Sequence, residues 1–248
     1  MIALAISADP VSKGLARILG LQEAPGASTF YTIQWRGITV VFHKGDSVEV
    51  PPEDELKKLG IRHLVVPSRH EMAKPRPMIT AHTPGVAPSL SVAHAGLKSW
   101  LFRRICSAKP EGYDCSMEAT HHEPNTDEVS VTFIEIGSTE REWRDERALK
   151  ALASAVEDMP SYEPGGAPAA MTVGDLHYSL ATQDVLQGLI DLGHVVHKDV
   201  VTADLVLKAL YKHVEKPQKI IVYKKSIKGP VRREVLDVLK GAEIEIRG

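Results

Sequence analysis

Residues 2–7 read Ile-Ala-Leu-Ala-Ile-Ser, and Ala8, Asp9 and Pro10 follow them directly. A short and almost wholly apolar run of this kind is typical of a strand that is buried on both faces of a sheet. Aspartate is a preferred residue for capping a helix N-terminus, and proline fits the first helical position. The stretch therefore predicts a buried strand that leads directly into a helix, and this helix is expected to end near Gly20.

Strand-like and helix-like stretches alternate along the rest of the chain, which favours an α/β fold with a mixed, largely parallel sheet flanked by helices. Further strands are expected at 38–42, 63–66, 78–80, 114–120, 129–136, 170–176, 220–223 and 243–246, and Val195-Val196 also favours a strand. Further helices are expected at 89–107, 139–158, 182–192, 202–213 and 230–240.

The length of the chain bounds its organisation. With 248 residues, 43% of them hydrophobic, a single α/β domain over residues 1–248 can bury a large core, and the Gly/Pro-rich segment 163–168 is a candidate internal loop boundary. No apolar run is long enough to span a bilayer, and Asp9 comes too early for a signal peptide. A cytoplasmic protein with no membrane partner is expected. Cys106 and Cys115 lack metal-ligand spacing and are expected to be reduced thiols.

Charge is distributed unevenly, although the formal net charge is only −2. Residues 111–163 contain fourteen acidic and four basic side chains, a net charge of −10, whereas residues 198–248 contain twelve basic and seven acidic ones, a net charge of +5. A basic C-terminal part could attract a polyanion such as a nucleic acid. Charge alone, however, favours an ordinary solvated surface.

Histidines are numerous, and several of them lie where an apolar strand is expected to end. His70, His82, the pair His121-His122 and His177 each close or follow such a run, out of eleven histidines in the chain. Open α/β sheets place their ligand sites at strand ends. The sequence therefore predicts that these four segments converge on one site.

The segment Glu118-Ala-Thr-His-His-Glu-Pro124 concentrates this chemistry. In a regular strand, Glu118, Thr120 and His122 would share one face and His121 the other, so that Glu118 could orient His122. A turn at Thr120 would instead bring both imidazoles to one side. A buried Glu118 needs a partner, for which Arg69, a protonated histidine or a metal-bound histidine are the candidates.

Histidine combined with carboxylate is the ligand set of hydrolytic zinc sites, although the spacing signatures of zinc proteins are absent. Zinc held by His70, His82 and His122 is one hypothesis, and a metal-free acid–base site is the other. The chain has neither a Gly-x-Ser-x-Gly elbow nor a Gly-x-x-x-x-Gly-Lys-Ser/Thr loop, so a dinucleotide or triphosphate ligand is not expected.

A series of motifs in the chain resembles a known family. These are Ser68-Arg-His70, His82-Thr83, Met117-Glu-Ala-Thr-His-His122 with Pro124, Ile136-Gly-Ser-Thr-Glu140 before Glu142-Trp143, Asp175-Leu-His-Tyr178 and Gly193-His194. Their types and order resemble the archaeal and plant type of D-aminoacyl-tRNA deacylase. The resemblance implies hydrolysis of the ester between a D-amino acid and the 3′ end of tRNA, which recycles the tRNA as chiral proofreading. It also implies zinc as a cofactor and a phosphorylase/hydrolase-like domain related to peptidyl-tRNA hydrolases.

With this resemblance, the site residues can be assigned expected roles. The expected catalytic residues are His122, Glu118, His121, His70, Arg69 and Thr120, with Arg69 or Thr120 near the oxyanion or the terminal phosphate. The expected tRNA and substrate contacts are Ser68, Thr83, His177, Tyr178, Lys224, Lys225, Lys228 and Arg232. A monomer is expected, with a weak dimer as the alternative. Glu123, Pro84-Gly85 and Met72 depart from the family pattern close to the site.

Two rival functions remain open at this point. One is a tRNA- or nucleotide-binding protein without catalysis, which turnover would exclude. The other is a metal-dependent hydrolase or phosphorylase that acts on small substrates, which would be active without tRNA.

Overall fold

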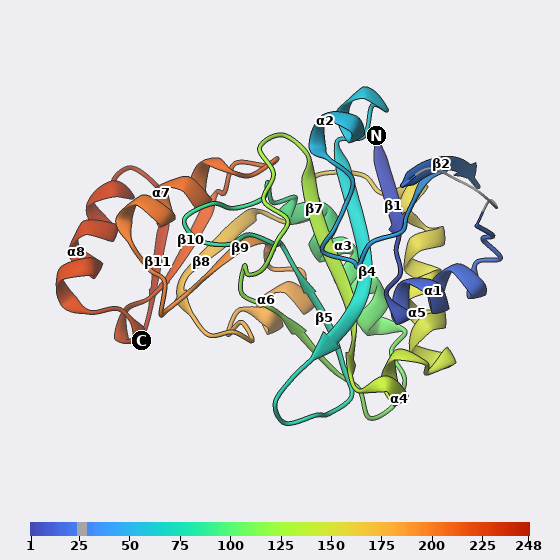
Figure 1. Ribbon diagram of the computed structural model, residues 1–248. Helices are drawn as coiled ribbons and strands as arrows, with labels where there is room; N and C mark the ends of the chain where they lie inside the picture. The colour runs from blue at the N-terminus through green and yellow to red at the C-terminus, as the bar shows by residue number, and fades with distance from the viewer. Residues whose placement is uncertain (24–28) are drawn as a thin grey trace.

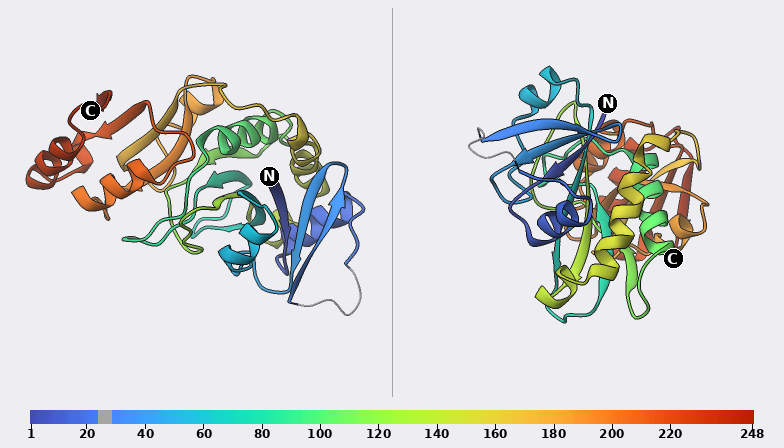
Figure 2. Two further views of the ribbon diagram at one scale, coloured as in Figure 1. Left: turned by 90° about the horizontal axis from the view of Figure 1, so that it is seen from above. Right: turned by 90° about the vertical axis from the view of Figure 1, so that its right-hand side faces the viewer.

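A computed structural model describes residues 1–23 and 29–248 of the protein (Figure 1). Its described strands form two sheets, one of seven strands and one of four. The four-stranded sheet and its helices make up one end of the molecule, and the seven-stranded sheet makes up the other (Figures 1 and 2). This mixed α/β architecture, with mostly parallel strands flanked by helices, confirms the predicted fold class.

The seven-stranded sheet has the order β2-β3-β1-β4-β7-β5-β6. Its strands are β1 (Ile2–Ile6), β2 (Phe30–Trp35), β3 (Ile38–His43), β4 (His63–Glu71), β5 (Met78–His82), β6 (Asp114–Met117) and β7 (Ser130–Ser138). Pairing is parallel except between β2 and β3 and between β5 and β7. The carboxyl ends of the parallel strands β4 and β7 therefore lie at the same edge.

Helices cover both faces of this sheet. They are α1 (Pro10–Ile18), α2 (Glu53–Lys58), α3 (Ala95–Ser107), α4 (Glu140–Trp143), α5 (Glu146–Glu157) and the 3₁₀ turn η1 (Met159–Ser161). The main core lies between one face and helices α1, α3 and α5, while α2 contributes Leu56 to the core on the other face. The carboxylate of Asp9 accepts hydrogen bonds from the amides of Val11 and Ser12, which confirms the predicted cap of α1.

The four-stranded sheet is parallel throughout, in the order β11-β10-β8-β9. Its elements are β8 (Ala169–Asp175), α6 (Thr182–Leu186), β9 (Asp191–His197), α7 (Ala203–Tyr211), β10 (Lys219–Tyr223), η2 (Lys224–Ser226), α8 (Gly229–Val238) and β11 (Ile244–Arg247). Helices α7 and α8 pack on one face of this sheet. Helix α3 packs against β9 as well as β5 and so joins the two sheets.

Several predicted boundaries were wrong. The helix expected at 139–158 is interrupted before Asp145, whose side chain caps the separate helix α5. The helix expected at 182–192 ends at Leu186, because Asp191–His197 forms strand β9. Helix α3 starts six residues later than the position expected at 89, and β2 was not predicted at all.

The prediction of reduced thiols was also wrong, because Cys106 at the end of α3 and Cys115 on β6 form a disulfide. Sequence spacing gave no indication that the two residues would meet. The predicted boundary segment 163–168 lies between η1 and β8, where the chain passes from one sheet to the other. Within the described residues, no helix is both long and apolar enough to cross a lipid bilayer.

Candidate active site

The structure brings together the five histidines that were expected to converge. His70 and His82 lie at the carboxyl ends of β4 and β5, His121 and His122 follow β6, and His177 follows β8 from the other sheet. We call these five residues the histidine cluster. A cavity of about 650 Å³ adjoins it, lined by Asp46, Ser47, Val48, Glu49, Ser68, Arg69, His70, Glu71, His121, His122, Glu135 and His177.

Three rings of the cluster are in mutual contact. The Nε2 atoms of His82 and His122 lie 3.0 Å apart, and the ring centroids of His82 and His121 are separated by 4.4 Å. His121 in turn lies 4.5 Å from His122, centroid to centroid. One nitrogen of each of these three residues lies within 4.8 Å of the others, an arrangement that could hold a metal ion.

A turn produces this arrangement, as in the second of the two alternatives drawn from the sequence. Strand β6 ends at Met117 rather than at Thr120, and His122 has a φ of 41°. The amide of Gly85 donates to the carbonyl oxygens of His121 and His122, and thereby fixes the turn against the loop after β5. Both rings consequently point to the same side.

Burial sets the protonation of these histidines. Burial, and next the charges of His121 and His122, hold the pKa of His82 well below its ordinary value. Burial likewise lowers the pKa of His121 to about 4. Both rings are therefore neutral at physiological pH, which is the state in which imidazole accepts a proton or binds a metal ion.

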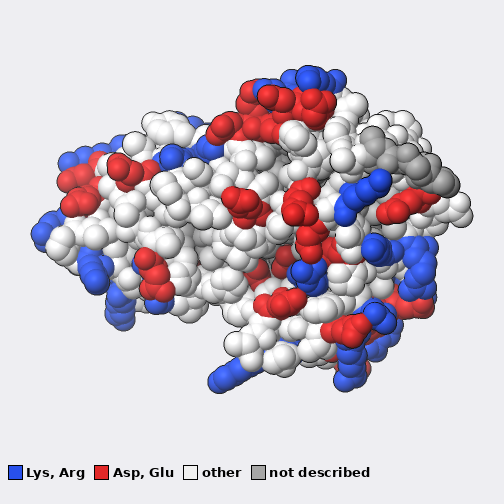
Figure 3. All heavy atoms as spheres, in the orientation of Figure 1, with Lys and Arg blue, Asp and Glu red and all other residues white. Residues whose placement is uncertain are grey.

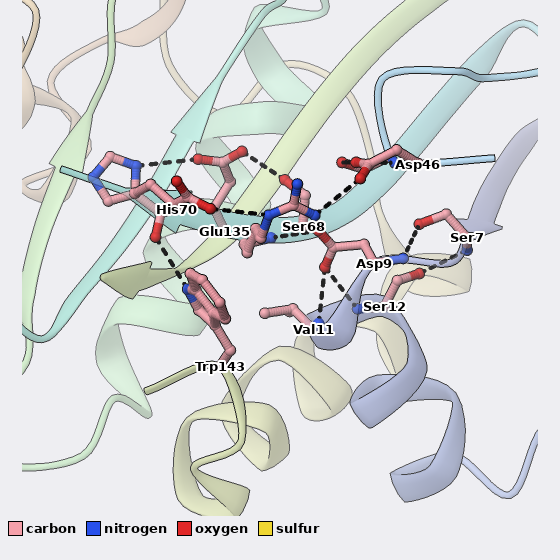
Figure 4. A network of polar contacts seen from close by, with 12 residues as sticks. Ser7, Asp9, Val11, Ser12, Asp46, Ser68, His70, Glu135 and Trp143 are labelled. Atoms are coloured by element: carbon pink, nitrogen blue, oxygen red, sulfur yellow. Dashed lines mark hydrogen bonds and ion pairs between the residues drawn. The ribbon is translucent and has the colours of Figure 1, made fainter. Parts of the chain in front are cut away.

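Beside these rings, His70 faces two buried carboxyl groups. Its Nδ1 atom lies 3.0 Å from Oε1 of Glu118 and 3.3 Å from Oε2 of Glu135. On the other side of the ring, Nε2 lies 2.9 Å from the hydroxyl of Tyr178. The indole of Trp143 donates to the carbonyl oxygen of His70, so the backbone as well as the ring is held in place (Figure 4).

The two carboxyl groups have opposite environments. Glu135 accepts hydrogen bonds from the hydroxyls of Ser68 and Thr80, whereas neither oxygen of Glu118 has a hydrogen-bond partner among the described residues. Burial raises the pKa of Glu118 well above its usual range, and the neighbouring charge of Glu135 adds to the effect. Burial also opposes ionisation of Glu135, but its hydrogen bonds with His70 and Ser68 outweigh burial and lower its pKa. Glu118 is thus the group that keeps a proton.

Glu118 does not orient His122, as a regular strand would have required. Its side chain is fully buried between His70 and His82, whose Nδ1 atoms lie 3.0 and 3.5 Å from its two oxygens. Its Oε2 also faces the Nε2 atoms of His121 and His177, at 3.8 and 3.9 Å. Glu118 is therefore the central residue of the cluster, surrounded by histidine nitrogens of which none is placed to donate a hydrogen bond to it.

Arg69 lines the cavity, but its guanidinium is surrounded by carboxylates. Nη1 donates to Asp9 at 2.9 Å and to Asp46 at 3.1 Å, and Nε donates to Glu71 at 3.1 Å. Asp9 is itself buried as the cap of α1. Arg69 therefore fixes the end of β4 to α1 and to the loop after β3.

The predicted hydroxyl residues face protein groups. Ser68 donates to Glu135, and Thr120 is hydrogen-bonded to Nδ1 of His194 at 3.0 Å. Thr83 accepts from the ammonium of Lys98, a fully buried residue on α3 that also donates to the carbonyl oxygen of Gly193. These contacts connect the floor of the site to α3 and β9.

The predicted phosphate contacts lie at the end of the second sheet. Lys224, Lys225 and Lys228 are exposed, while Arg232 donates to the carbonyl oxygen of Lys224. These residues follow β10, which is parallel to β8, so they leave the same edge of the sheet as His177. A Cβ placed on Gly174 would clash with Ile227. The segment after β10 that carries these lysines therefore packs closely against the end of β8, from which the chain continues to His177.

Sequence reasoning missed three residues of this neighbourhood: Glu135, Lys98 and Asp46. Glu135 interrupts the apolar run Phe-Ile-Glu-Ile on β7, and a charged residue inside a buried strand is a signal that could have been used. Lys98 and Asp46 carry no such signal, because one lies in a helix and the other in a loop.

Comparisons with known proteins agree with one another. Residues 58–247 match a family described as D-aminoacyl-tRNA deacylase. The D-aminoacyl-tRNA deacylase of Pyrobaculum aerophilum is 44% identical over 246 residues, 97% of this chain and 96% of the relative. That of Aeropyrum pernix is 30% identical over 269 residues, 96% of each chain. The crystal structure of a conserved protein of unknown function has the same fold, with a TM-score of 0.87 and 23% identity over 99% of this chain and 95% of that one.

Proposed function

This chain belongs to the D-aminoacyl-tRNA deacylase family, so its function is D-aminoacyl-tRNA deacylation, and we propose that the histidine cluster carries out the reaction. The bond that is cleaved is the ester between the D-amino acid and the 3′ end of tRNA. Water supplies the hydroxyl group that leaves with the amino acid, and the ribose oxygen of the tRNA takes up a proton.

One observation carries this assignment: neutral imidazoles and a protonated carboxyl group meet beside a cavity of a size that admits an aminoacyl group. Ester hydrolysis needs a base for the water and an acid for the leaving oxygen. Two groups whose environments push their pKa values apart can fill these two roles. Glu118 and Glu135, which share His70, are such a pair.

The donor set formed by His82, His121 and His122 also fits zinc. Hydrolytic zinc sites commonly use three protein ligands and leave one position for water, and all three rings here present a nitrogen to a common point. When bound, zinc lowers the pKa of its water and so provides hydroxide near neutral pH. His121 takes the place that the sequence-based hypothesis gave to His70, because Nδ1 of His70 faces Glu118 and Glu135.

The other residues expected to be catalytic have supporting roles in this proposal. His70 moves the proton, with its ring fixed by Tyr178 on one side and by the two carboxyl groups on the other. Thr120 and Arg69 position the loops around the cluster, since their polar atoms are engaged with His194 and with carboxylates.

We further propose that the tRNA lies over the end of the second sheet. Lys224, Lys225 and Lys228 are exposed there, at the sheet edge from which the chain leads to His177. Contacts of lysine with phosphates provide affinity without reading sequence, while the 3′ terminus reaches the histidine cluster.

The test is to incubate the protein with the same tRNA charged with a D-amino acid or with its L-enantiomer, each with and without a chelator. Loss of the D-ester alone is the expected result, and loss that the chelator prevents supports zinc. If neither ester is lost beyond its spontaneous rate, the protein does not catalyse this reaction. If both are lost equally, the activity is not chiral proofreading.

A further inference from the structure

One wall of the cavity beside the histidine cluster is acidic. Asp46 and Glu49 come from the loop after β3, and Glu71 is the last residue of β4. We call these three residues the acidic wall. Among the described residues, Arg69 is the lysine or arginine that lines the same cavity, and because it also pairs with Asp9 it cannot neutralise all three carboxylates.

The members of the acidic wall differ in the ion pairs and hydrogen bonds that they form. Asp46 and Glu71 form ion pairs with Arg69 at 3.1 Å. Glu49 accepts a hydrogen bond from the backbone amide of Asp46, but no ion pair is found for it within residues 1–23 and 29–248. Its side chain is exposed, and it lines the cavity. Glu49 therefore has a carboxylate oxygen available for a cation.

The floor of the site holds a further carboxyl group, and this one lacks a hydrogen-bond partner among the described residues. Glu118 is fully buried, neither of its oxygens has a hydrogen-bond partner among the described residues, and Oε2 points between the rings of His121 and His177. Both rings line the same cavity. Acceptor oxygens thus lie on two sides of the cavity, and the negative charge among them lies on the acidic wall.

An aminoacyl ester carries a cation, its α-ammonium group, close to the bond that is cleaved. In an aminoacyl ester the α-ammonium nitrogen is separated from the reacting carbonyl carbon by one atom, about 2.5 Å through space. If the ester carbon lies at the histidines, the ammonium group must lie within the cavity. The phosphates of tRNA, in contrast, are repelled by the acidic wall and attracted by the basic end of the molecule. Figure 3 shows acidic side chains near the middle of this face and basic ones at both ends, one of which is the end formed by the second sheet.

We propose that the acidic wall binds the α-ammonium group of the aminoacyl ester, with Glu49 as its direct hydrogen-bond partner. The substrate would then lie across the histidine cluster in one direction only, with the amino acid towards the loop after β3 and the tRNA towards η2 and α8. Fixing the ammonium group and the ester leaves the side chain of a D- and of an L-amino acid pointing to different sides of the cavity. This inference rests on the proposed function, because it assumes an aminoacyl ester as the substrate.

The experiment compares two substrates that differ in this one group. One is tRNA charged with a D-amino acid, and the other is the same tRNA charged with the matching D-2-hydroxy acid, in which a neutral hydroxyl replaces the ammonium. The value of kcat/KM for both is measured for the unmodified protein, for Glu49→Gln and for Glu111→Gln, an exposed glutamate outside the cavity. Glu49→Gln keeps the shape and a hydrogen-bonding oxygen but removes the charge.

The expected result is that Glu49→Gln lowers kcat/KM for the amino ester by about tenfold, the effect of losing one charged hydrogen bond, and leaves the hydroxy ester unchanged. Glu111→Gln should change neither value. An equal change for both esters, or no change for either, would overturn the inference.

A binding measurement separates this inference from the proposed function. The probe is 3′-amino-3′-deoxyadenosine carrying a D-amino acid through an amide bond, compared with its D-2-hydroxyacyl counterpart by calorimetry. If the unmodified protein hydrolyses neither ester, the proposed function fails. Tighter binding of the amino probe that depends on Glu49 would still support the acidic wall, and equal binding of both probes would exclude it.

Discussion

Two groups of histidines in this protein have opposite surroundings. The histidine cluster borders a cavity of about 650 Å³, and its central carboxyl group, Glu118, has no hydrogen-bond partner among the described residues. The other group, which we call the inner histidines, consists of His63, His94, His194 and His213, whose rings lie against each other in two pairs, His63 with His94 and His194 with His213. The two groups consist of the same residue type but differ in what their rings contact.

Each inner histidine is engaged with the protein. His63 is hydrogen-bonded to the hydroxyl of Ser130, His94 lies 2.6 Å from Oε1 of Glu215, and Nε2 of His213 accepts from the amide of His194. Of their buried nitrogens, only Nδ1 of His213 lacks a hydrogen-bond partner among the described residues, and the hydrogen bonds of the other buried nitrogens stabilise one arrangement of the core. The comparison supports our proposal that the histidines bordering the cavity act in catalysis, whereas the inner histidines, most of whose nitrogens contact protein groups, stabilise the fold.

The largest expected effect is on turnover, and it should separate the two groups. His121→Ala should lower kcat at least about 100-fold, because general acid–base or metal-ligand roles contribute at least that much, with little change in melting temperature. His94→Ala should do the opposite: it leaves the carboxylate of Glu215 with only the amides of Ala95 and Gly96 as partners and should cost roughly 1–3 kcal/mol of stability, while the folded enzyme keeps its kcat. Steady-state kinetics and thermal unfolding of both variants provide the test. A stability loss in His121→Ala as large as that in His94→Ala would remove the distinction.

Part of this comparison was accessible from the sequence, and part was not. Strand ends marked by histidine predicted His70, His82, His121, His122 and His177 as neighbours. A common edge of parallel strands holds for β4 and β7 but not for β5, which runs antiparallel to β7 and pairs His82 with Phe133. His194 also lies in a strand, and the sequence shows its residue type. The sequence does not show its contacts with Thr120 and Lys212, because these depend on how β9 and α7 pack.

Carboxylate partners were still harder to predict. Glu135 reaches His70 through the register of β4 and β7, which pairs Ser68 with Glu135, and a register is not encoded in any single segment. The turn at His121-His122 depends on Gly85 from another loop. The disulfide between Cys106 and Cys115 depends on how the end of α3 lies on β6. Local patterns therefore predicted elements and their ends, whereas side-chain pairs required the assembled fold.

The second effect concerns Lys98, which lies between the two groups. Burial lowers the pKa of Lys98 from an ordinary value of 10.5 to about 7. Because the folded-state pKa is the lower one, the unfolded chain binds the extra proton between these values, and stability rises as pH increases through this window. Below about pH 7 the folded and the unfolded chain both carry the proton on Lys98, and the folded protein bears the full free-energy cost of burying the charged ammonium.

Lys98→Met removes this dependence. The stability of the unmodified protein should therefore rise relative to Lys98→Met by a few kcal/mol between pH 7 and pH 10. Chemical denaturation across that range measures the difference, and the exposed Lys150→Met serves as the control. Parallel pH profiles for Lys98→Met and the unmodified protein would show that the ammonium of Lys98 is not buried as described.

A third, smaller effect concerns the stability of the fold beside the cluster, while the rate of the reaction should stay unchanged. The disulfide joins residues nine positions apart, and opening a loop of that length should cost about 2–3 kcal/mol. Adding a reductant should lower the melting temperature of the unmodified protein but not that of Cys106→Ser. If the reductant leaves the unmodified protein unaffected, the disulfide does not stabilise it.

The smallest expected effect is at the basic end of the second sheet. Replacing any one of Lys224, Lys225 and Lys228 by glutamine should weaken tRNA binding and reduce the slope of log affinity against log salt concentration by about one unit or less. Filter binding at several salt concentrations measures this slope. Lys150→Gln should leave it unchanged, and an identical slope in all four variants would place the tRNA elsewhere.

The histidine cluster is the centre of this account, and single-turnover hydrolysis by His122→Ala tests it most directly. With enzyme in excess over D-aminoacyl-tRNA, and with tRNA binding measured in parallel, the variant should bind within about threefold of the unmodified protein and hydrolyse the ester at least about 100-fold more slowly. Hydrolysis at the full rate by a variant that binds normally would contradict the account, because the reaction would then take place without the cluster.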